Sequence, residues 1–126
     1  MDEVDRERYR KDVLSLKERL AGFDPEEQEI WEVYAATEKL IAILKFRLDY
    51  ETPGVVTKLP EAGDRAKLLE ASRELLSKAA DEISKGRLVE SIGTLRKARN
   101  GLRRYLIEKR RSVIKSRTSP RSEPSA

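Results

Sequence analysis

Residues 75–106, LLSKAADEISKGRLVESIGTLRKARNGLRRYL, carry the clearest fold signal in this chain. On both sides of Gly86 the apolar residues recur at steps of three and four, which is the period of an amphipathic helix. The short link Ser84–Arg87 folds the second helix back along the first, so the stretch predicts an antiparallel helical hairpin. Small residues along it, such as Ala79 and Ser91, allow the two helix axes to approach closely.

A second strong helical pattern comes earlier in the chain. It begins at Asp24-Pro25, a capping residue followed by the residue type that fits the first helical position, and it ends before Pro53. Its apolar stripe, which Phe46 widens and Trp31 borders, covers more than half of the helix circumference. Such a wide apolar surface is typical of the most buried helix of a bundle.

A first helix and one long connection complete the pattern. Residues 2–21 carry apolar side chains at helical spacing, and Gly22 ends that pattern. The segment 50–63, YETPGVVTKLPEAG, contains Pro and Gly residues that block a helix, and the next helix begins at Asp64. A connection of this length permits a crossover between the second and third helices. We expect three apolar residues to hold it against the bundle, namely Val55, Val56 and Leu59.

Together these patterns predict an all-α fold, a four-helix antiparallel bundle with one long connection between its second and third helices. The bundle occupies residues 1–114, and residues 115–126 form a flexible basic tail that is rich in Ser, Pro and Arg. The predicted core residues are Leu16, Leu20, Ile30, Tyr34, Ile41, Leu44, Leu48, Leu75, Leu76, Ile83, Ile92, Leu95 and Leu102.

The composition excludes several kinds of chemistry. The chain has no Cys and no His, so it cannot build a Ser-His-Asp or Cys-His catalytic site, a zinc site of the usual Cys/His type or a disulfide. It also lacks the glycine-rich motifs that bind phosphate. We therefore expect no enzyme active site, no cofactor and no metal. Scarce Asn, Gln and Met among abundant charged residues are typical of proteins from thermophiles.

The sequence gives no indication of a membrane segment. The longest apolar run, Leu40–Leu44, is far shorter than the about 20 residues that a membrane-spanning helix needs. The acidic N-terminus lacks the basic start and apolar run of a signal peptide. We therefore expect a soluble, cytoplasmic protein.

These exclusions leave one catalytic alternative, a carboxylate-bound Mg²⁺ site. Helical nucleotide pyrophosphohydrolases pair E-x-x-E and E-x-x-D motifs on neighbouring helices, and Glu26, Glu29 and Glu32 supply one half of such a pattern. The third helix offers no matching half. Acidic residues near the start of a helix also complement its dipole, and we favour this interpretation.

The hairpin resembles those of small archaeal helical proteins, among them members of the higher-eukaryote-and-prokaryote nucleotide-binding (HEPN-like) class. The ribonucleases of that class depend on an Arg-x-x-x-x-His motif. Arg99 opens such a motif here, but Arg104 occupies the position of the His. The resemblance therefore implies a helical bundle without nuclease activity.

Positive charge is concentrated in the last quarter of the chain. Residues 96–126 hold eleven Lys or Arg and two acidic residues, whereas residues 1–95 hold sixteen and twenty-one. Two series of cations, each repeating every seven residues, predict a double basic stripe on the exposed side of the last helix, and further cations follow it. The residues are Arg96, Lys97, Arg103, Arg104, Arg110, Arg111, Lys115 and Arg117.

Such a stripe suits a phosphate backbone, because each neutralised phosphate releases counterions and Arg can bind phosphate with two hydrogen bonds. Cations near the end of a helix also complement its dipole, and they can meet an acidic protein surface. Tyr105 is expected to face the core, so no aromatic residue accompanies the stripe, and base stacking on a single strand is not favoured.

The last helix also carries apolar residues beyond the point where its neighbours should end. Ile107, Val113 and Ile114 would form a seam for self-association if they are exposed. We therefore expect a non-catalytic interaction module that engages a protein partner, or a second copy of itself, through its last helix. Binding of nucleic acid by the same helix and tail is the alternative.

Overall fold

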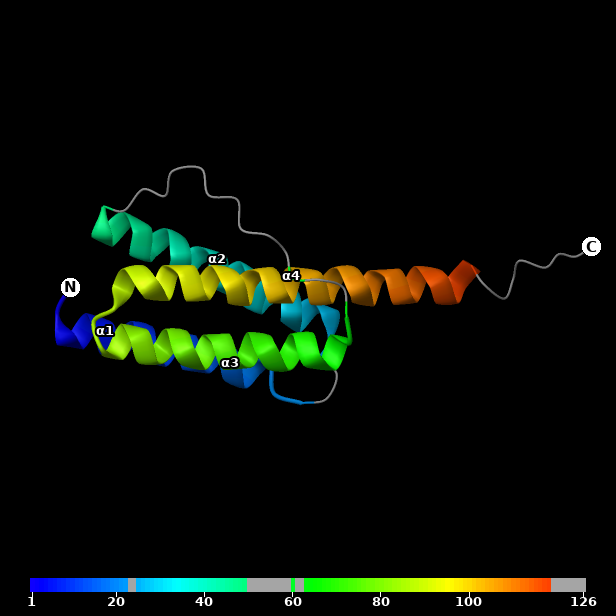
Figure 1. Ribbon diagram of the computed structural model, residues 1–126, viewed down its shortest axis with the longest axis horizontal. Helices are drawn as coiled ribbons and strands as arrows, with labels where there is room; N and C mark the ends of the chain where they lie inside the picture. The colour runs from blue at the N-terminus through cyan, green and yellow to red at the C-terminus, as the bar shows by residue number, and fades with distance from the viewer. Residues whose placement is uncertain (23–24, 50–59, 61–62, 119–126) are drawn as a thin grey trace, which may run out of the picture.

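A computed structural model describes residues 1–22, 25–49, 60 and 63–118, with only the backbone of residues 115–118. Four helices pack into a bundle, and no strand occurs in these residues, which confirms the predicted all-α fold (Figure 1). The helices are α1 (Glu3–Arg19), α2 (Glu27–Leu48), α3 (Arg65–Ser84) and α4 (Leu88–Thr118).

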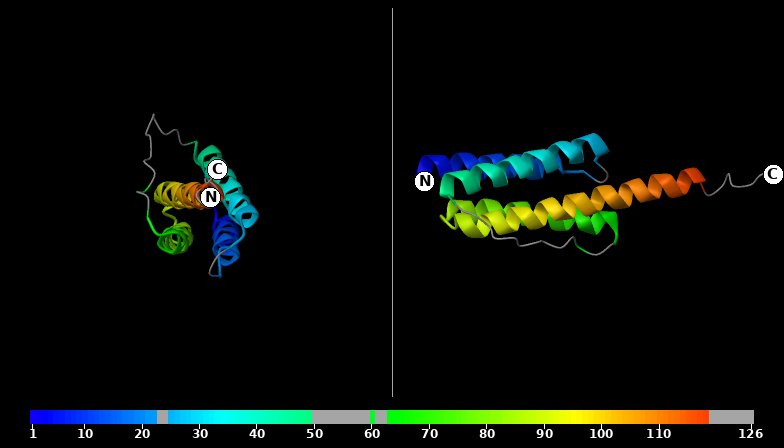
Figure 2. Two further views of the ribbon diagram at one scale, coloured as in Figure 1. Left: turned by 90° about the vertical axis from the view of Figure 1, so that its right-hand side faces the viewer. Right: turned by 90° about the horizontal axis from the view of Figure 1, so that it is seen from above.

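The four helices occupy the corners of a square when the bundle is viewed along its axis (Figure 2). α1 packs beside α2 and α3, and α4 packs beside α3 and α2. Each helix runs antiparallel to both neighbours, so α2 and α3 point in the same direction at opposite corners (Figures 1 and 2). The end of α2 and the start of α3 therefore lie at opposite ends of the bundle, an arrangement that the long connection between them permits. Val55, Val56 and Leu59 lie outside the described residues.

Local sequence explains where three of the helices begin or end. The Asp2 carboxylate accepts a hydrogen bond from the Asp5 N–H at 2.8 Å and caps α1, and Asp64 caps α3 in the same way. Gly86 has a φ of +78°, which an L-amino acid side chain disfavours, and it turns the chain between α3 and α4. The predicted hairpin is therefore confirmed.

The predicted start of α2 was wrong by two residues. Pro25 precedes the helix, and Glu26 occupies the capping position without a side-chain hydrogen bond. Asp24, the predicted cap, lies outside the described residues. The neighbouring carboxylates still lie in the first turn, where the helix dipole favours them.

The core agrees closely with the one predicted from the spacing of apolar residues. Ten of the predicted core residues are buried, and Tyr34, Leu48 and Leu75 are partly buried against them. Phe46 was predicted wrongly, since 87% of it is exposed instead of widening the core. α4, rather than α2, carries the largest number of buried residues.

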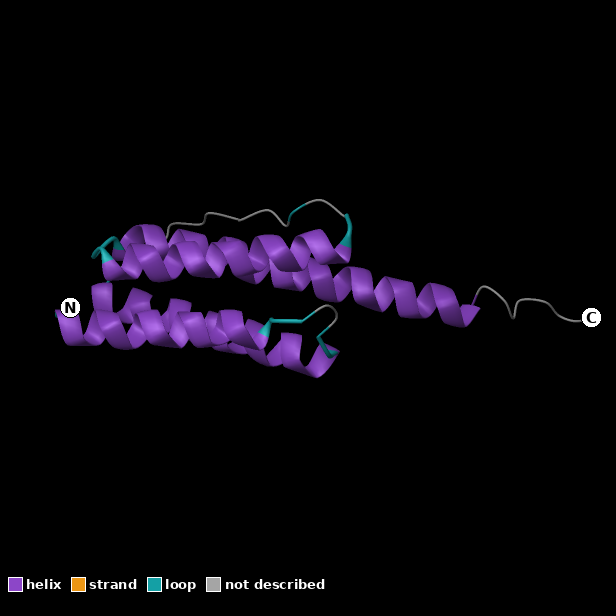
Figure 3. Cartoon of the chain, turned by 90° about the horizontal axis from the view of Figure 1, so that it is seen from below, coloured by secondary structure: helices purple, strands orange, loops and turns teal. Residues whose placement is uncertain are grey.

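α4 is much longer than the helix that it pairs with. It has 31 residues against 20 in α3, and at about 1.5 Å per residue this difference extends it well beyond the bundle. Figure 3 shows this projection past the other three helices. Every residue from Arg110 to Ile114 is exposed. The helix reaches Thr118, whereas we expected the helical pattern to dissolve after Ile114.

Candidate nucleic-acid interface

The basic stripe of α4 contains cations that remain open to solvent. Lys97, Arg103, Arg110 and Arg111 are exposed. Arg111 lies 3.4 Å from a carboxylate oxygen of Glu108 on the same helix. Among the described residues, none of these four cations forms an ion pair with another helix. Lys97, Arg103 and Arg110, which pair with no described carboxylate, therefore leave positive charge uncompensated on this surface.

The remaining cations of the stripe either are partly buried or have side chains outside the described part of the chain. Arg104 is largely buried, and its Nε lies 3.2 Å from Glu108 Oε1, close enough for an ion pair but not oriented as a hydrogen bond. Arg96 is half-buried. The backbone of Lys115 and Arg117 belongs to α4, and their side chains are outside the described part.

Arg99, which does not belong to the stripe, shows the contrasting arrangement. Its guanidinium contacts Glu38 of α2 at 2.8 Å and Asn100 Oδ1 at 3.2 Å. Arg99, which opens the HEPN-like motif, and Arg104, which stands where that motif has His, are both in ion pairs.

A groove between α2 and α4 brings an aromatic side chain to the open cations. Its volume is about 320 Å³. Trp31, at the start of α2, is 47% exposed and lies in it. The residues that line the groove are Glu27, Trp31, Arg103, Leu106, Ile107, Arg110 and Arg111.

The groove corrects the prediction that no aromatic residue accompanies the stripe. Tyr105 does face the core, with 1% exposed, as expected. Trp31 was missed because it is far from Arg103 in sequence and reaches it only through the pairing of α2 with α4. The signal that could have found it is its position at the border of the apolar stripe, near the start of a helix antiparallel to α4.

Trp31 is oriented by its neighbour. Its ring lies edge-to-face with that of Tyr34, with centroids 5.7 Å apart and planes at 80°. Such a contact stabilises the position of an indole that solvent would otherwise leave mobile. Among the described residues, no cation stacks on the indole.

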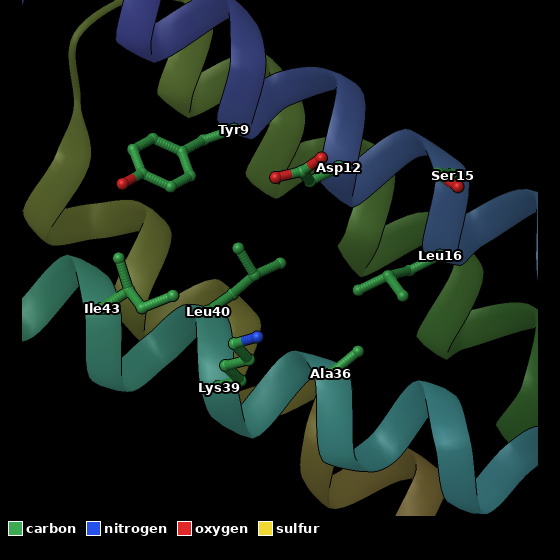
Figure 4. A pocket seen from close by; sticks show the side chains of 8 residues that line it. All are labelled: Tyr9, Asp12, Ser15, Leu16, Ala36, Lys39, Leu40 and Ile43. Atoms are coloured by element: carbon green, nitrogen blue, oxygen red, sulfur yellow. The ribbon is translucent and has the colours of Figure 1, made fainter.

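A second groove lies between α1 and α2 and is chemically different (Figure 4). It measures about 310 Å³, and Leu16, Leu40 and Ile43 make much of its lining. Its polar residues include one carboxylate, Asp12, and one amine, Lys39. This groove therefore has no excess of positive charge with which to bind a polyanion.

Arginine side chains connect α1 to α2 near both ends of this groove. Near one end Arg19 Nε contacts Glu29 at 2.6 Å, and the same guanidinium also pairs with Glu32. Near the other end Arg47 contacts Asp5 at 2.8 Å and donates to the Tyr9 hydroxyl at 3.0 Å.

These contacts shift the pKa values of the acidic partners. The hydrogen bond from Arg47 holds the pKa of the Asp5 carboxyl below its usual value, and the one from Arg19 does the same for the pKa of Glu29. Glu29 and Glu32, two of the three carboxylates considered above for magnesium, both pair with the Arg19 guanidinium. No group of three or more metal-binding side chains occurs among the described residues.

The apolar residues considered for self-association differ in exposure. Ile107 is half-buried in the groove beside Trp31. Val113 is 38% exposed and Ile114 is 53% exposed on the projecting part of α4. The projecting turns therefore present apolar and basic side chains together.

In the described residues no helix is long and apolar enough to cross a membrane.

Comparisons with known proteins found no relative of the chain. No protein-family model matches the chain, and neither a curated protein nor a solved structure does.

Proposed function

We propose that this chain is a non-catalytic binding module that holds the phosphate backbone of a nucleic acid against the basic face of α4. One observation carries the proposal. Lys97, Arg103 and Arg110 are exposed, and no carboxylate of the described residues pairs with them.

Three other arginines that face a neighbouring helix behave differently. Arg19, Arg47 and Arg99 each pair with a carboxylate across a helix boundary. Unlike these three arginines, Arg103 and Arg110 line a groove against a neighbouring helix without a carboxylate partner among the described residues. Arg103 and Arg110 are two turns apart, about 10 Å along the axis, so they can contact different phosphates of one strand.

A salt series tests this proposal with the full-length chain. Binding to duplex DNA, single-stranded DNA and structured RNA should weaken steeply as salt increases. The double variant Arg103→Gln/Arg110→Gln should reduce the slope of log K against log salt by about 0.7 to 0.9 for each lost phosphate contact. The matched control, Lys11→Gln/Lys78→Gln, removes two exposed cations from α1 and α3 and should leave the slope nearly unchanged. Absence of binding at low salt would overturn the proposal.

Binding of a protein partner or of a second copy of the chain is the second candidate function, and it is the one that the sequence alone favours. Exposure of Val113 and Ile114 on a helix that projects from the bundle favours it. Light scattering after size exclusion should then show a dimer that Ile114→Ser reduces to a monomer. A monomer at all concentrations argues against self-association. Binding to a different, acidic protein would then be tested by pull-down.

A further inference from the structure

We propose that the groove between α2 and α4 binds an unpaired nucleobase, stacked on Trp31, while Arg103 and Arg110 hold the adjacent phosphates. The preferred ligand is then single-stranded nucleic acid. This inference rests on the proposed function and adds the strandedness of the ligand to it.

The side chains of the groove match the three parts of a nucleotide strand. The indole of Trp31, 47% exposed, offers a π surface, and bases of every kind stack on such a surface. Leu106 and Ile107 supply apolar lining next to it. Arg103 and Arg110 supply charge at the same groove, and Arg guanidinium suits phosphate geometry.

Size and charge narrow the choice of ligand. A volume of about 320 Å³ is near the lower end of the range for small-molecule pockets, roughly 300 to 1,000 Å³, which suits one ring system. Three arginines line the groove against one acidic residue, Glu27, so its ligand should be anionic. An acidic peptide would satisfy the charge but would leave the indole without a planar partner.

Duplex nucleic acid fits this groove less well than a single strand. The bases of a duplex are already stacked on one another, so they reach a protein aromatic ring only after unpairing. The edge-to-face contact with Tyr34 orients the indole, which reduces the ordering that a stacked base would require. We therefore expect the phosphate contacts to serve both kinds of ligand and the stacking contact to serve single strands alone.

Trp31 is the only Trp in the chain, so intrinsic fluorescence reports on this groove specifically. The full chain is titrated with oligothymidylate, with an abasic oligomer of equal length, and with a duplex. Oligothymidylate should quench Trp31 emission, and the abasic oligomer should bind more weakly without quenching. Single-stranded RNA replaces oligothymidylate in a parallel arm.

Variants separate stacking from charge. Measured by anisotropy of a labelled oligomer, Trp31→Ala should weaken single-strand binding about tenfold and leave duplex binding nearly unchanged. Phe46→Ala is the matched control, because Phe46 is an exposed aromatic residue at the other end of α2 and should have no effect. A thermal melt of each variant verifies that it is folded.

The outcomes distinguish the two proposals. Salt-dependent binding of all three ligands with no quenching, and with no effect of Trp31→Ala, would overturn the stacking site and leave phosphate binding in place. No binding of any ligand would overturn both. Quenching by single strands together with the loss in Trp31→Ala would support both.

Discussion

The bundle contains two helix pairs, α1 with α2 and α3 with α4, and different contacts hold each pair together. α3 and α4 approach closely where Gly101 meets Ser72, large apolar side chains of both helices are buried in the core, and a short turn at Gly86 links them. Between α1 and α2 the helices leave a groove of about 310 Å³, and arginine bridges join them on both sides of it.

The stability of the two pairs should therefore respond differently to salt and pH. Burial of apolar surface excludes water and varies little with salt, whereas ion pairs at the surface are screened by salt and vary with pH. The groove that carries Trp31 lies between the two pairs, where α2 meets α4. Its geometry therefore depends on both kinds of contact.

Leucine truncation should show the largest difference between the two pairs. Leu102 on α4 is fully buried, so Leu102→Ala leaves a closed cavity and should cost about 3 to 4 kcal/mol of unfolding free energy. Leu16 on α1 lines the open groove, and Leu16→Ala should cost nearer to about 2 kcal/mol because water can enter the enlarged space. Urea denaturation of both variants measures the difference. Equal losses would mean that α1 and α2 pack as tightly as α3 and α4.

A double-mutant cycle between Gly101 and Ser72 should show the next largest effect on the free energy of unfolding. A Cβ at Gly101 would lie far inside contact distance of the Ser72 hydroxyl, which is buried and donates to the Leu68 carbonyl at 2.9 Å. Gly101→Ala should therefore cost about 1 to 2 kcal/mol, despite the better helix propensity of Ala.

Removing the hydroxyl should relieve this clash, because the Ser72 Cβ would be an ordinary 3.7 Å from the new methyl group. The double variant Gly101→Ala/Ser72→Ala should recover the loss, and the coupling free energy should be about 1 kcal/mol or more. Additive single losses would show that the helices move apart instead of meeting at this point.

The close pair was also the part most predictable from the sequence. The spacing of Leu76, Ile83, Leu95 and Leu102 and the turn at Gly86 specify both helices and their direction, since short links require antiparallel neighbours. The exposure of Phe46 could not be predicted in this way. Periodicity shows which side of a helix is apolar, but how much of that side is covered depends on the distance to the neighbouring helix.

The candidate site was predictable in its charge and not in its aromatic residue. Arg103 and Arg110 share one helix, so their heptad spacing alone places them together. Trp31 joins them from another helix, and that contact depends on which helices are neighbours in the bundle. The ion pair that withdraws Arg104 likewise depends on the rotamer of Glu108, which spacing does not determine.

The smallest effect should come from the arginine bridges of the loose pair, and pH should reveal it. The folded chain lowers the pKa values of Asp5 and Glu29 through Arg47 and Arg19. The unfolded chain therefore binds protons more readily than the folded chain below about pH 4 to 5. The stabilisation is fully present above that range and is lost as pH falls through the folded pKa values.

The double variant Asp5→Asn/Glu29→Gln lacks this linkage. It should be less stable than the parent at pH 7, by a smaller free energy than the leucine truncations or Gly101→Ala. The difference from the parent should narrow at pH 3 and in 1 M NaCl. Urea unfolding at both pH values measures it. Glu18→Gln/Glu74→Gln removes two exposed carboxylates that pair with no cation of the described residues, and its stability relative to the parent should change little with pH. If both double variants respond to pH alike, general charge repulsion and not the bridges controls the acid sensitivity, and α1 must be held to α2 mainly by its apolar contacts.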